Sequence, residues 1–139
     1  MRIRHLTAAA ATTAVLAIIL IGCYPSTLRY HWAPEVAPSV AQLQAQFGIN
    51  AITYPGHDPD EAHAADFMLP GAGHNAAWVT RGYALANYAR TNNAWLHVHY
   101  IVYRQHIWNI ERNADGWRLM PSRGNWTQNH MDHFHISFY

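Results

Sequence analysis

Apolar positions near the start of the folded part of the chain recur at helical spacing. Pro38 suits the first turn of a helix, and Gly48 is placed to end it. Between them, Leu43 and Phe47 are four residues apart and lie on one helical face. The pattern therefore predicts a short helix over residues 38–47.

Two strand-like runs follow this helix. Residues 51–54 form the first, which is closed by Pro55-Gly56 and the polar loop 57–61. Residues 64–69 form the second, which ends at Pro70-Gly71. We expect both to be short strands.

The longest helical pattern lies in the middle of the chain. Asn75 is a suitable N-cap for a helix that runs to about Asn92, with Leu85 and Ala89 on one face. We expect this to be the main helix, packed on a sheet.

The second half of the chain is richer in strand-forming residues. Residues 95–103 are β-branched and aromatic, and Gln105-His106 separates them from the shorter run 107–110, as in a hairpin. Residues 133–139 form a last strand. The order of elements predicts an α+β domain: a small antiparallel sheet packed with one main helix and a short N-terminal helix.

The N-terminus has the features of an export signal. Arg2 and Arg4 precede an apolar run over residues 6–21, which is a little short for a spanning helix of roughly 17–25 residues. We therefore predict a signal peptide over residues 1–22. An uncleaved N-terminal anchor is the alternative, and both place the domain outside the cytoplasmic membrane.

The only cysteine, Cys23, directly follows this signal. The sequence Leu20-Ile21-Gly22-Cys23 resembles a bacterial lipobox, in which the signal is removed before a cysteine that carries lipid. Residues 23–37 are rich in Pro, Ser and Ala and are typical of a tether. The domain itself is predicted over residues 38–139, on the outer face of the membrane or secreted.

Composition narrows the possible chemistry. The chain of 139 residues is 50% hydrophobic and 12% charged, with net charge +1, which fits one folded domain and argues against nucleic-acid binding. A single cysteine excludes an internal disulfide and a thiolate zinc cage. Eleven histidines are present, so a metal would be held by histidines together with carboxylates. We expect a monomer.

The C-terminal strand carries the most informative histidines. Period-2 alternation places His133, His135 and Ser137 on one face and apolar residues on the other. Such a pair suits zinc with one direct ligand and one functional neighbour. Asp132, at the edge of this strand, could bring its carboxylate over the metal as the base.

The remaining ligands are expected from residues 54–67. Asp66 lies between apolar residues of a predicted strand, where a carboxylate is costly unless it is paired or bound to metal. Either His57 or His63 could join it. His63 and Asp66 are three apart on a strand and point to opposite faces, so His57 is favoured.

Together these motifs resemble a known group of zinc peptidases. A loop histidine, the motif Ala-x-Asp-Phe at residues 64–67 and the terminal Asp132-His-x-His135 are similar to those of lysostaphin, D-alanyl-D-alanine metallopeptidases and hedgehog-type domains. The D-alanyl-D-alanine carboxypeptidase and L-alanyl-D-glutamate endolysin branch is the most similar. The run 100–108 also resembles a strand-turn-strand of extracellular actinobacterial members.

The resemblance implies roles for particular residues. His57, Asp66 and His135 would be the zinc (Zn2+) ligands, and Asp132 would be the catalytic base. His133 would assist beside the metal or on the oxyanion side.

The remaining candidates for substrate binding have no motif support. Members of the group often carry an upstream arginine, and none lies between Tyr30 and Arg81, so Arg104 is a substitute. Trp126, in a loop before the site, and His99, from a second His-x-His pair, are further candidates. Other histidines are assigned to structural or exposed positions, namely His31, His74, His106 and His130.

The motifs and the predicted export signal are consistent with two functions. The first is zinc-dependent hydrolysis of peptide bonds in peptidoglycan stem peptides or cross-links, by a carboxypeptidase or an endopeptidase. The second is a non-catalytic lipoprotein that keeps the fold as a wall-binding or zinc-binding module. Cleavage of defined muropeptides by the zinc-loaded protein would distinguish them.

Overall fold

A computed structural model of the chain describes residues 31–139. The predicted signal peptide over 1–22, the lipidation of Cys23 and the first part of the tether lie outside the described residues. Within 31–139, none of the helices is both long and apolar enough to span a membrane.

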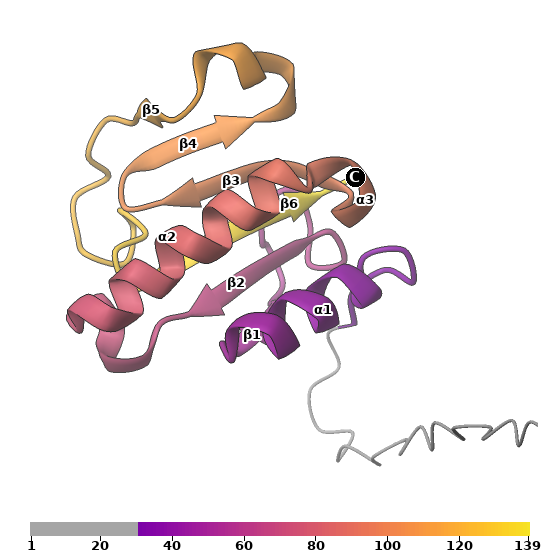
Figure 1. Cartoon of the computed structure of the whole chain (residues 1–139), viewed down its shortest axis with the longest axis horizontal. Coiled ribbons are helices and arrows are strands. Elements are labelled where there is room, and N and C mark those ends of the chain that lie inside the picture. Colours follow the sequence, from indigo (N-terminus) through magenta and orange to yellow (C-terminus); the bar gives the residue numbers. More distant parts are fainter. Residues whose placement is uncertain (1–30) are drawn as a thin grey trace, which may run out of the picture.

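The fold is built on one antiparallel sheet of six strands, in the order β1-β2-β6-β3-β4-β5 (Figure 1). The C-terminal strand therefore lies in the middle of the sheet, between two strands that precede it by tens of residues. The strands are β1 (Ala51–Ile52), β2 (Ala64–Met68), β3 (Val98–Tyr103), β4 (His106–Asn109), β5 (Arg118–Leu119) and β6 (His133–Phe138).

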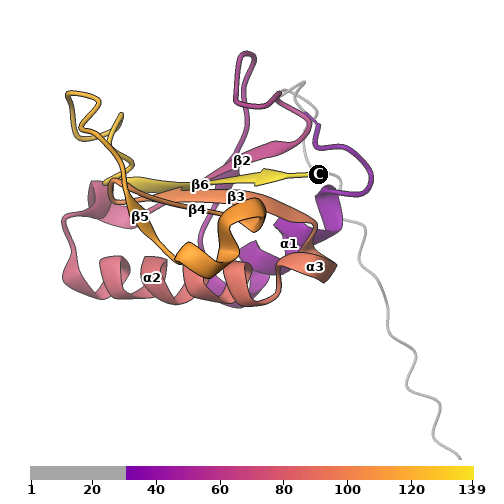
Figure 2. The same ribbon diagram turned by 90° about the horizontal axis from the view of Figure 1, so that it is seen from above.

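Two helices cover one face of this sheet, as the view in Figure 2 shows. They are α1 (Ala37–Phe47) and α2 (Ala76–Thr91). The side chain of Asn75 accepts hydrogen bonds from two backbone amides in the first turn of α2, which satisfies donors that a helix start leaves free. Short helical turns complete the domain: η1 (Pro70–Gly73), α3 (Asn93–Leu96) and η2 (Ile110–Asp115).

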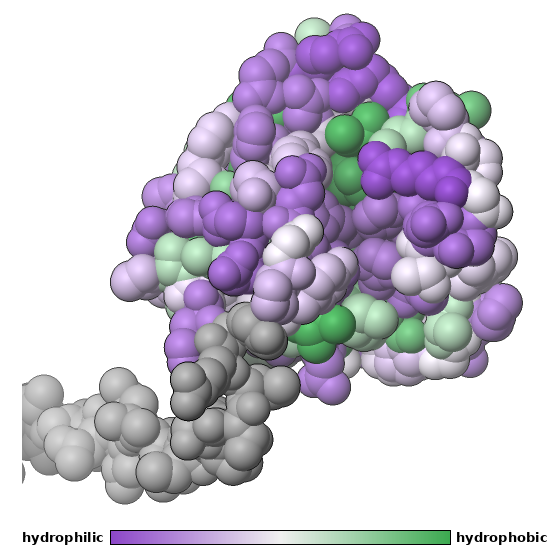
Figure 3. All heavy atoms as spheres, turned by 180° about the vertical axis from the view of Figure 1, so that it is seen from behind, coloured by the Kyte–Doolittle hydropathy of each residue, from purple (hydrophilic) through white to green (hydrophobic). Residues whose placement is uncertain are grey.

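Strand alternation separates an apolar face from a polar one. In β6, Phe134, Ile136 and Phe138 face the helices and belong to the buried core. His133 and His135 point to the other face, where hydrophilic residues predominate (Figure 3). The helix-covered face therefore forms the buried core, and the opposite face carries the polar side chains.

The α+β class and the antiparallel sheet confirm the prediction, and three local elements differ from it. The strand expected from Trp95 begins only at Val98, because α3 intervenes and His97 ends it with a φ of 56°. The first strand is two residues long. The β3–β4 hairpin turns at Arg104-Gln105, where both residues have positive φ.

The packed part of the chain begins within the range that was assigned to the tether. Val36 is fully buried, and the indole Nε1 of Trp32 donates a hydrogen bond of 2.9 Å to the carbonyl of Ala64. The amide of Ala33 donates to the carbonyl of Ala62 at 2.9 Å. These contacts fasten the segment before α1 to the start of β2.

Candidate metal centre

Asp66 and His135 lie opposite each other on the neighbouring strands β2 and β6. Both side chains are buried, and Oδ1 of Asp66 is 3.0 Å from Nδ1 of His135. Cross-strand partners on one face of a sheet are held at short range by the backbone ladder. The sheet itself therefore fixes two of the three predicted ligands.

A tight turn delivers the third predicted ligand, His57. The amide of His57 donates to the carbonyl of Tyr54 at 3.1 Å, and Gly56 has a φ of 79°. Proline followed by a residue with positive φ is the signature of a type II turn, and Pro55-Gly56 supplies both. The turn stacks the rings of Tyr54 and His57 with centroids 4.3 Å apart.

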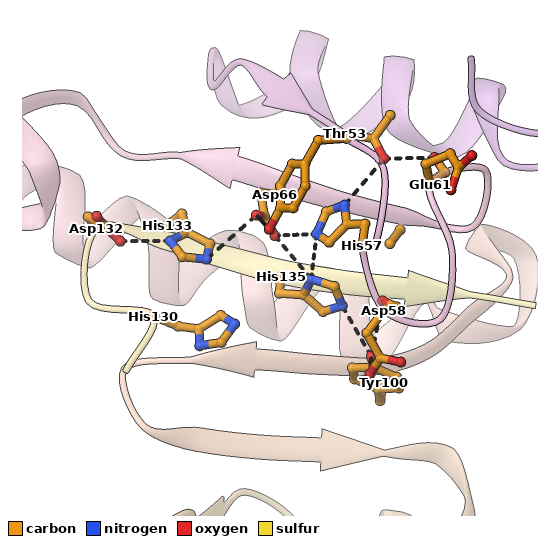
Figure 4. A network of polar contacts seen from close by, with 12 residues as sticks. Thr53, His57, Asp58, Glu61, Asp66, Tyr100, His130, Asp132, His133 and His135 are labelled. Atoms are coloured by element: carbon orange, nitrogen blue, oxygen red, sulfur yellow. Dashed lines mark hydrogen bonds and ion pairs between the residues drawn. The ribbon is translucent and has the colours of Figure 1, made fainter. Parts of the chain in front are cut away.

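The ligand atoms of His57, Asp66 and His135 form a small triangle (Figure 4). Nε2 of His57 is 2.9 Å from Oδ1 of Asp66 and 3.0 Å from Nδ1 of His135. Three zinc ligands at about 2.0–2.1 Å in tetrahedral geometry are separated by about 3.3 Å, so the spacing fits. A single proton can be shared by only two of these three atoms, whereas a metal cation can be coordinated by all three. This buried group could hold a metal ion.

Hydrogen bonding fixes which nitrogen of His57 faces the triangle. The hydroxyl of Thr53 donates to the carbonyl of Glu61 at 2.7 Å, so its oxygen is left to accept from Nδ1 of His57 at 3.2 Å. The proton of the neutral ring is then on Nδ1. Its Nε2 presents a lone pair to the metal position, as a ligand must.

A second series of hydrogen bonds determines which nitrogen of His135 faces the triangle. The hydroxyl of Tyr100 donates to Oδ2 of Asp58 at 2.6 Å and accepts from Nε2 of His135 at 3.2 Å. Burial, with the nearby Asp58 carboxylate, raises the pKa of Tyr100 well above its usual range, so the phenol keeps its proton. Nδ1 of His135 is therefore the nitrogen that faces the triangle.

Asp66 is held as a carboxylate by its surroundings. Burial alone would raise its pKa, but the imidazoles of His135 and His57, which can donate to Oδ1 only while no metal occupies their lone pairs, outweigh burial and lower the pKa well below its usual range. Its second oxygen accepts from the hydroxyl of Tyr54 at 3.2 Å. A charged oxygen is thus available at the triangle.

The predicted pair Asp132 and His133 lies beside the triangle. Nδ1 of His133 is 2.6 Å from Oδ1 of Asp132, and Nε2 is 3.7 Å from Oδ2 of Asp66. The other oxygen of Asp132 accepts from the hydroxyl of Thr127 at 2.6 Å. Contrary to the expected placement over the metal, both oxygens of Asp132 are turned to these partners, and His133 is the one that faces the cavity.

His130 belongs to the site although its sequence position gave no sign of this. Its ring centroid is 4.7 Å from that of His133, and burial together with the neighbouring imidazoles of His133 and His135 lowers its pKa to about 4. The amide of Arg104, in the β3–β4 turn, donates to the carbonyl of His130 at 2.9 Å. This backbone hydrogen bond between distant segments brings the His130 ring to the cavity, and the periodicity of the sequence does not predict it.

A cavity of about 600 Å³ opens over the triangle. Arg123 lines it, and so it brings the cationic group that was expected from Arg104. Besides His57, Asp66 and His135, the cavity is lined by residues from two loops and three strands, among them Tyr54, Asp58, Tyr100, Thr127, Gln128, His130 and His133.

The three weaker candidates lie outside the lining of this cavity. The guanidinium of Arg104 lies 5.7 Å from the ring centroid of Trp126, and the indole of Trp126 donates to the carbonyl of Ala72 at 2.9 Å. Both side chains hold the loop 121–132 in place. His99 instead pairs with Glu111 at 2.8 Å.

His63, the alternative to His57, faces away from the triangle. Its Nδ1 lies 2.9 Å from Oδ1 of Asp60, and its Nε2 lies 3.5 Å from Oε1 of Glu35. The hydrogen bond to Asp60 raises the pKa of His63. The sequence preference for His57 therefore agrees with the geometry.

Comparison with known families gives one result. The model of a family described as "VldE, C-terminal domain" matches residues 31–131, well over half of the chain, and includes His57 and Asp66. Comparisons with curated proteins and with solved structures gave no match. The chain belongs to the VldE C-terminal domain family.

Proposed function

We propose that this protein is a zinc metallopeptidase that hydrolyses peptide bonds in peptidoglycan stem peptides or cross-links. The observation that carries the proposal is the convergence of His57, Asp66 and His135 on one point at the base of an open cavity. Two imidazole nitrogens and one carboxylate oxygen form a ligand set that suits zinc and leaves room for a further ligand. Bound there, zinc would supply Lewis-acid polarisation of a substrate carbonyl.

His133 is the residue that we assign to proton transfer. With Nδ1 held by the Asp132 carboxylate, Nε2 of His133 presents its lone pair to the cavity. It would accept a proton from an attacking water and return it to the leaving amine. Asp132, whose pKa is lowered by Thr127 and His133 against the effect of burial, stays ionised and orients the ring.

The choice of a peptide substrate rests on two features. The Ala-x-Asp-Phe and Asp-His-x-His motifs resemble those of D-alanyl-D-alanine peptidases, whose hedgehog-like fold we also propose here. The guanidinium of Arg123 in the cavity wall would pair with a substrate carboxylate or carbonyl. The predicted signal and lipidated Cys23 would keep the enzyme at the outer face of the cytoplasmic membrane, beside peptidoglycan.

The test is cleavage of defined muropeptides by the full-length protein in detergent, with products followed by mass spectrometry. We expect zinc-dependent release of D-alanine or of a cross-link fragment, lost on chelation and restored by zinc. His57→Ala, Asp66→Asn and His135→Ala should each lose both bound zinc and cleavage. His99→Ala is the matched control, since this histidine lies outside the cavity.

One alternative gives a different result in the same assay. A non-catalytic wall-binding or zinc-binding lipoprotein would retain zinc in the wild type but cleave no stem-peptide or cross-bridge bond. Zinc-loaded protein that is inactive on every muropeptide would therefore overturn the proposed peptidase function while leaving the metal site intact.

A further inference from the structure

A second hollow lies on the opposite face of the sheet from the metal centre. It has a volume of about 250 Å³ and is lined by Tyr83, Asn87, Tyr103, His106 and Trp117. It lies between α2 and the outer strands of the sheet, where α2 no longer covers them. We call it the aromatic hollow.

Strand alternation keeps the two cavities apart. In β3, Val102 lines the metal cavity whereas Tyr103 lines the aromatic hollow. In β4, Ile107 lines the metal cavity whereas His106 lines the hollow. Since successive strand residues point to opposite faces, a ligand in the hollow cannot be part of the site at the triangle.

Aromatic side chains dominate the walls of the hollow. Tyr83 is 46% exposed and meets Tyr103 edge to face, with centroids 4.9 Å apart. Leu119 pairs with His106 across β4 and β5, so its side chain lies on this same face, and it is 71% exposed. Apolar surface that is left open beside a hollow commonly marks a binding site.

Polar atoms in the hollow are arranged for hydrogen bonding to a ligand. Oδ1 of Asn87 accepts from the indole of Trp117 at 3.2 Å, which leaves the Asn87 amide nitrogen as a donor. Nδ1 of His106 donates to the carbonyl of Arg104 at 2.8 Å, which leaves Nε2 of the neutral ring as an acceptor. Within residues 31–139, neither of these atoms nor the Tyr83 hydroxyl has a hydrogen-bond partner.

We propose that the aromatic hollow binds a neutral sugar ring of a glycan chain. No acidic side chain, arginine or lysine lines it, so a charged ligand would find no counter-charge there. The C–H face of a pyranose ring packs on the negative face of an aromatic ring, and its hydroxyls need both donors and acceptors at the edges. The hollow supplies both features. The proposal is independent of the metal centre.

The test is titration of the 15N-labelled full-length protein in detergent with a neutral trisaccharide of N-acetylglucosamine. We expect saturable shifts of the Trp117 indole and the Asn87 side-chain amide signals, with a millimolar dissociation constant. Tyr83→Ala should weaken binding about tenfold, in keeping with the loss of one aromatic contact. Tyr83 and Asn87 are exposed, so Tyr83→Ala and Asn87→Ala should keep the fold.

Controls locate the binding. Trp95→Ala removes another exposed aromatic residue outside the hollow and should leave the affinity unchanged, as should His135→Ala in the metal centre. Absence of saturable shifts, or shifts confined to the metal cavity, would overturn the proposal. So would binding of a proline-rich peptide at these signals where the trisaccharide does not bind.

Discussion

Oδ1 of Asp132 lies 2.6 Å from Nδ1 of His133, and this pair lies directly beside the triangle of His57, Asp66 and His135. The carboxylate is held from behind by the hydroxyl of Thr127. An arrangement in which a carboxylate orients an imidazole fixes the tautomer and makes the outward-facing nitrogen a better base. Asp132 therefore influences the cavity through His133.

Replacing Asp132 by Asn tests this arrangement. An Asn side chain can hydrogen-bond His133 but supplies no charge, so kcat on a muropeptide should fall about 10²- to 10⁴-fold with bound zinc unchanged. Asp115→Asn is the control, since this exposed carboxylate pairs with Arg112 away from the cavity. A full rate in Asp132→Asn would remove the pair from the mechanism.

Tyr100→Phe tests the hydrogen-bond chain behind His135. Loss of the hydroxyl removes the acceptor for Nε2 of His135, so the ring no longer has a fixed tautomer. Loss of such a partner typically weakens metal binding about 10- to 100-fold, and competition with a chromogenic chelator would measure it. Tyr103→Phe, a hydroxyl deletion on the same strand facing the other side, should leave zinc affinity unchanged. Equal zinc affinity in both variants would contradict the assignment.

The residues that the strands contribute to the site could be predicted from the sequence. His133 and His135 share a face in β6, and Asp66 was identified because a carboxylate in an apolar strand requires a partner. Both inferences depend on local periodicity, which the backbone enforces. His57 followed by elimination, because its loop can curl back to Asp66.

Contacts between distant segments could not be predicted in this way. Tyr100 and Asp58 meet across 42 residues, and no local pattern links them. Arg104 was proposed as a substitute for the missing upstream arginine because it lies beside the predicted sheet, whereas Arg123 reaches the cavity from a loop without periodicity. His130 has a positive φ of 54°, a backbone feature that the residue type does not suggest.

Gly56→Ala should loosen the turn that carries His57. No atom lies within 4 Å of the position a Cβ would take, so crowding is absent and the cost comes from the backbone φ of 79°. A residue with a Cβ pays roughly 1–2 kcal/mol in this left-handed region. We expect weaker zinc binding by calorimetry and a lower Tm. Gly116 also has a positive φ and open space around the Cβ position but lies away from the cavity, so Gly116→Ala should lower Tm without weakening zinc binding. Equal loss of zinc affinity in both variants would contradict a local role for the Gly56 turn.

The His63 and Asp60 pair should make stability depend on pH. The hydrogen bond to Asp60 raises the pKa of His63, so its contribution is fully present below the unfolded value near 6.5 and is lost as pH rises through the folded pKa. Exposed pairs contribute below about 1 kcal/mol, so the effect is small. Urea unfolding should show His63→Gln less stable than wild type at pH 5.5 and closer to it at pH 8.5. A difference that grows with pH would contradict this sign.

Arg123→Gln tests which arginine meets the substrate. If the Arg123 guanidinium pairs with a terminal carboxylate, KM for a stem peptide should rise about 10- to 100-fold, the usual effect of losing a charged hydrogen bond. The same peptide with an amidated C-terminus should be affected far less, because it offers no charge to lose. Arg112→Gln, on the surface beside Asp115, should leave both values unchanged. An equal rise for the acid and the amide would show that Arg123 shapes the loop instead of binding the carboxylate. A rise confined to the acid in Arg104→Gln would show that Arg104 binds the carboxylate.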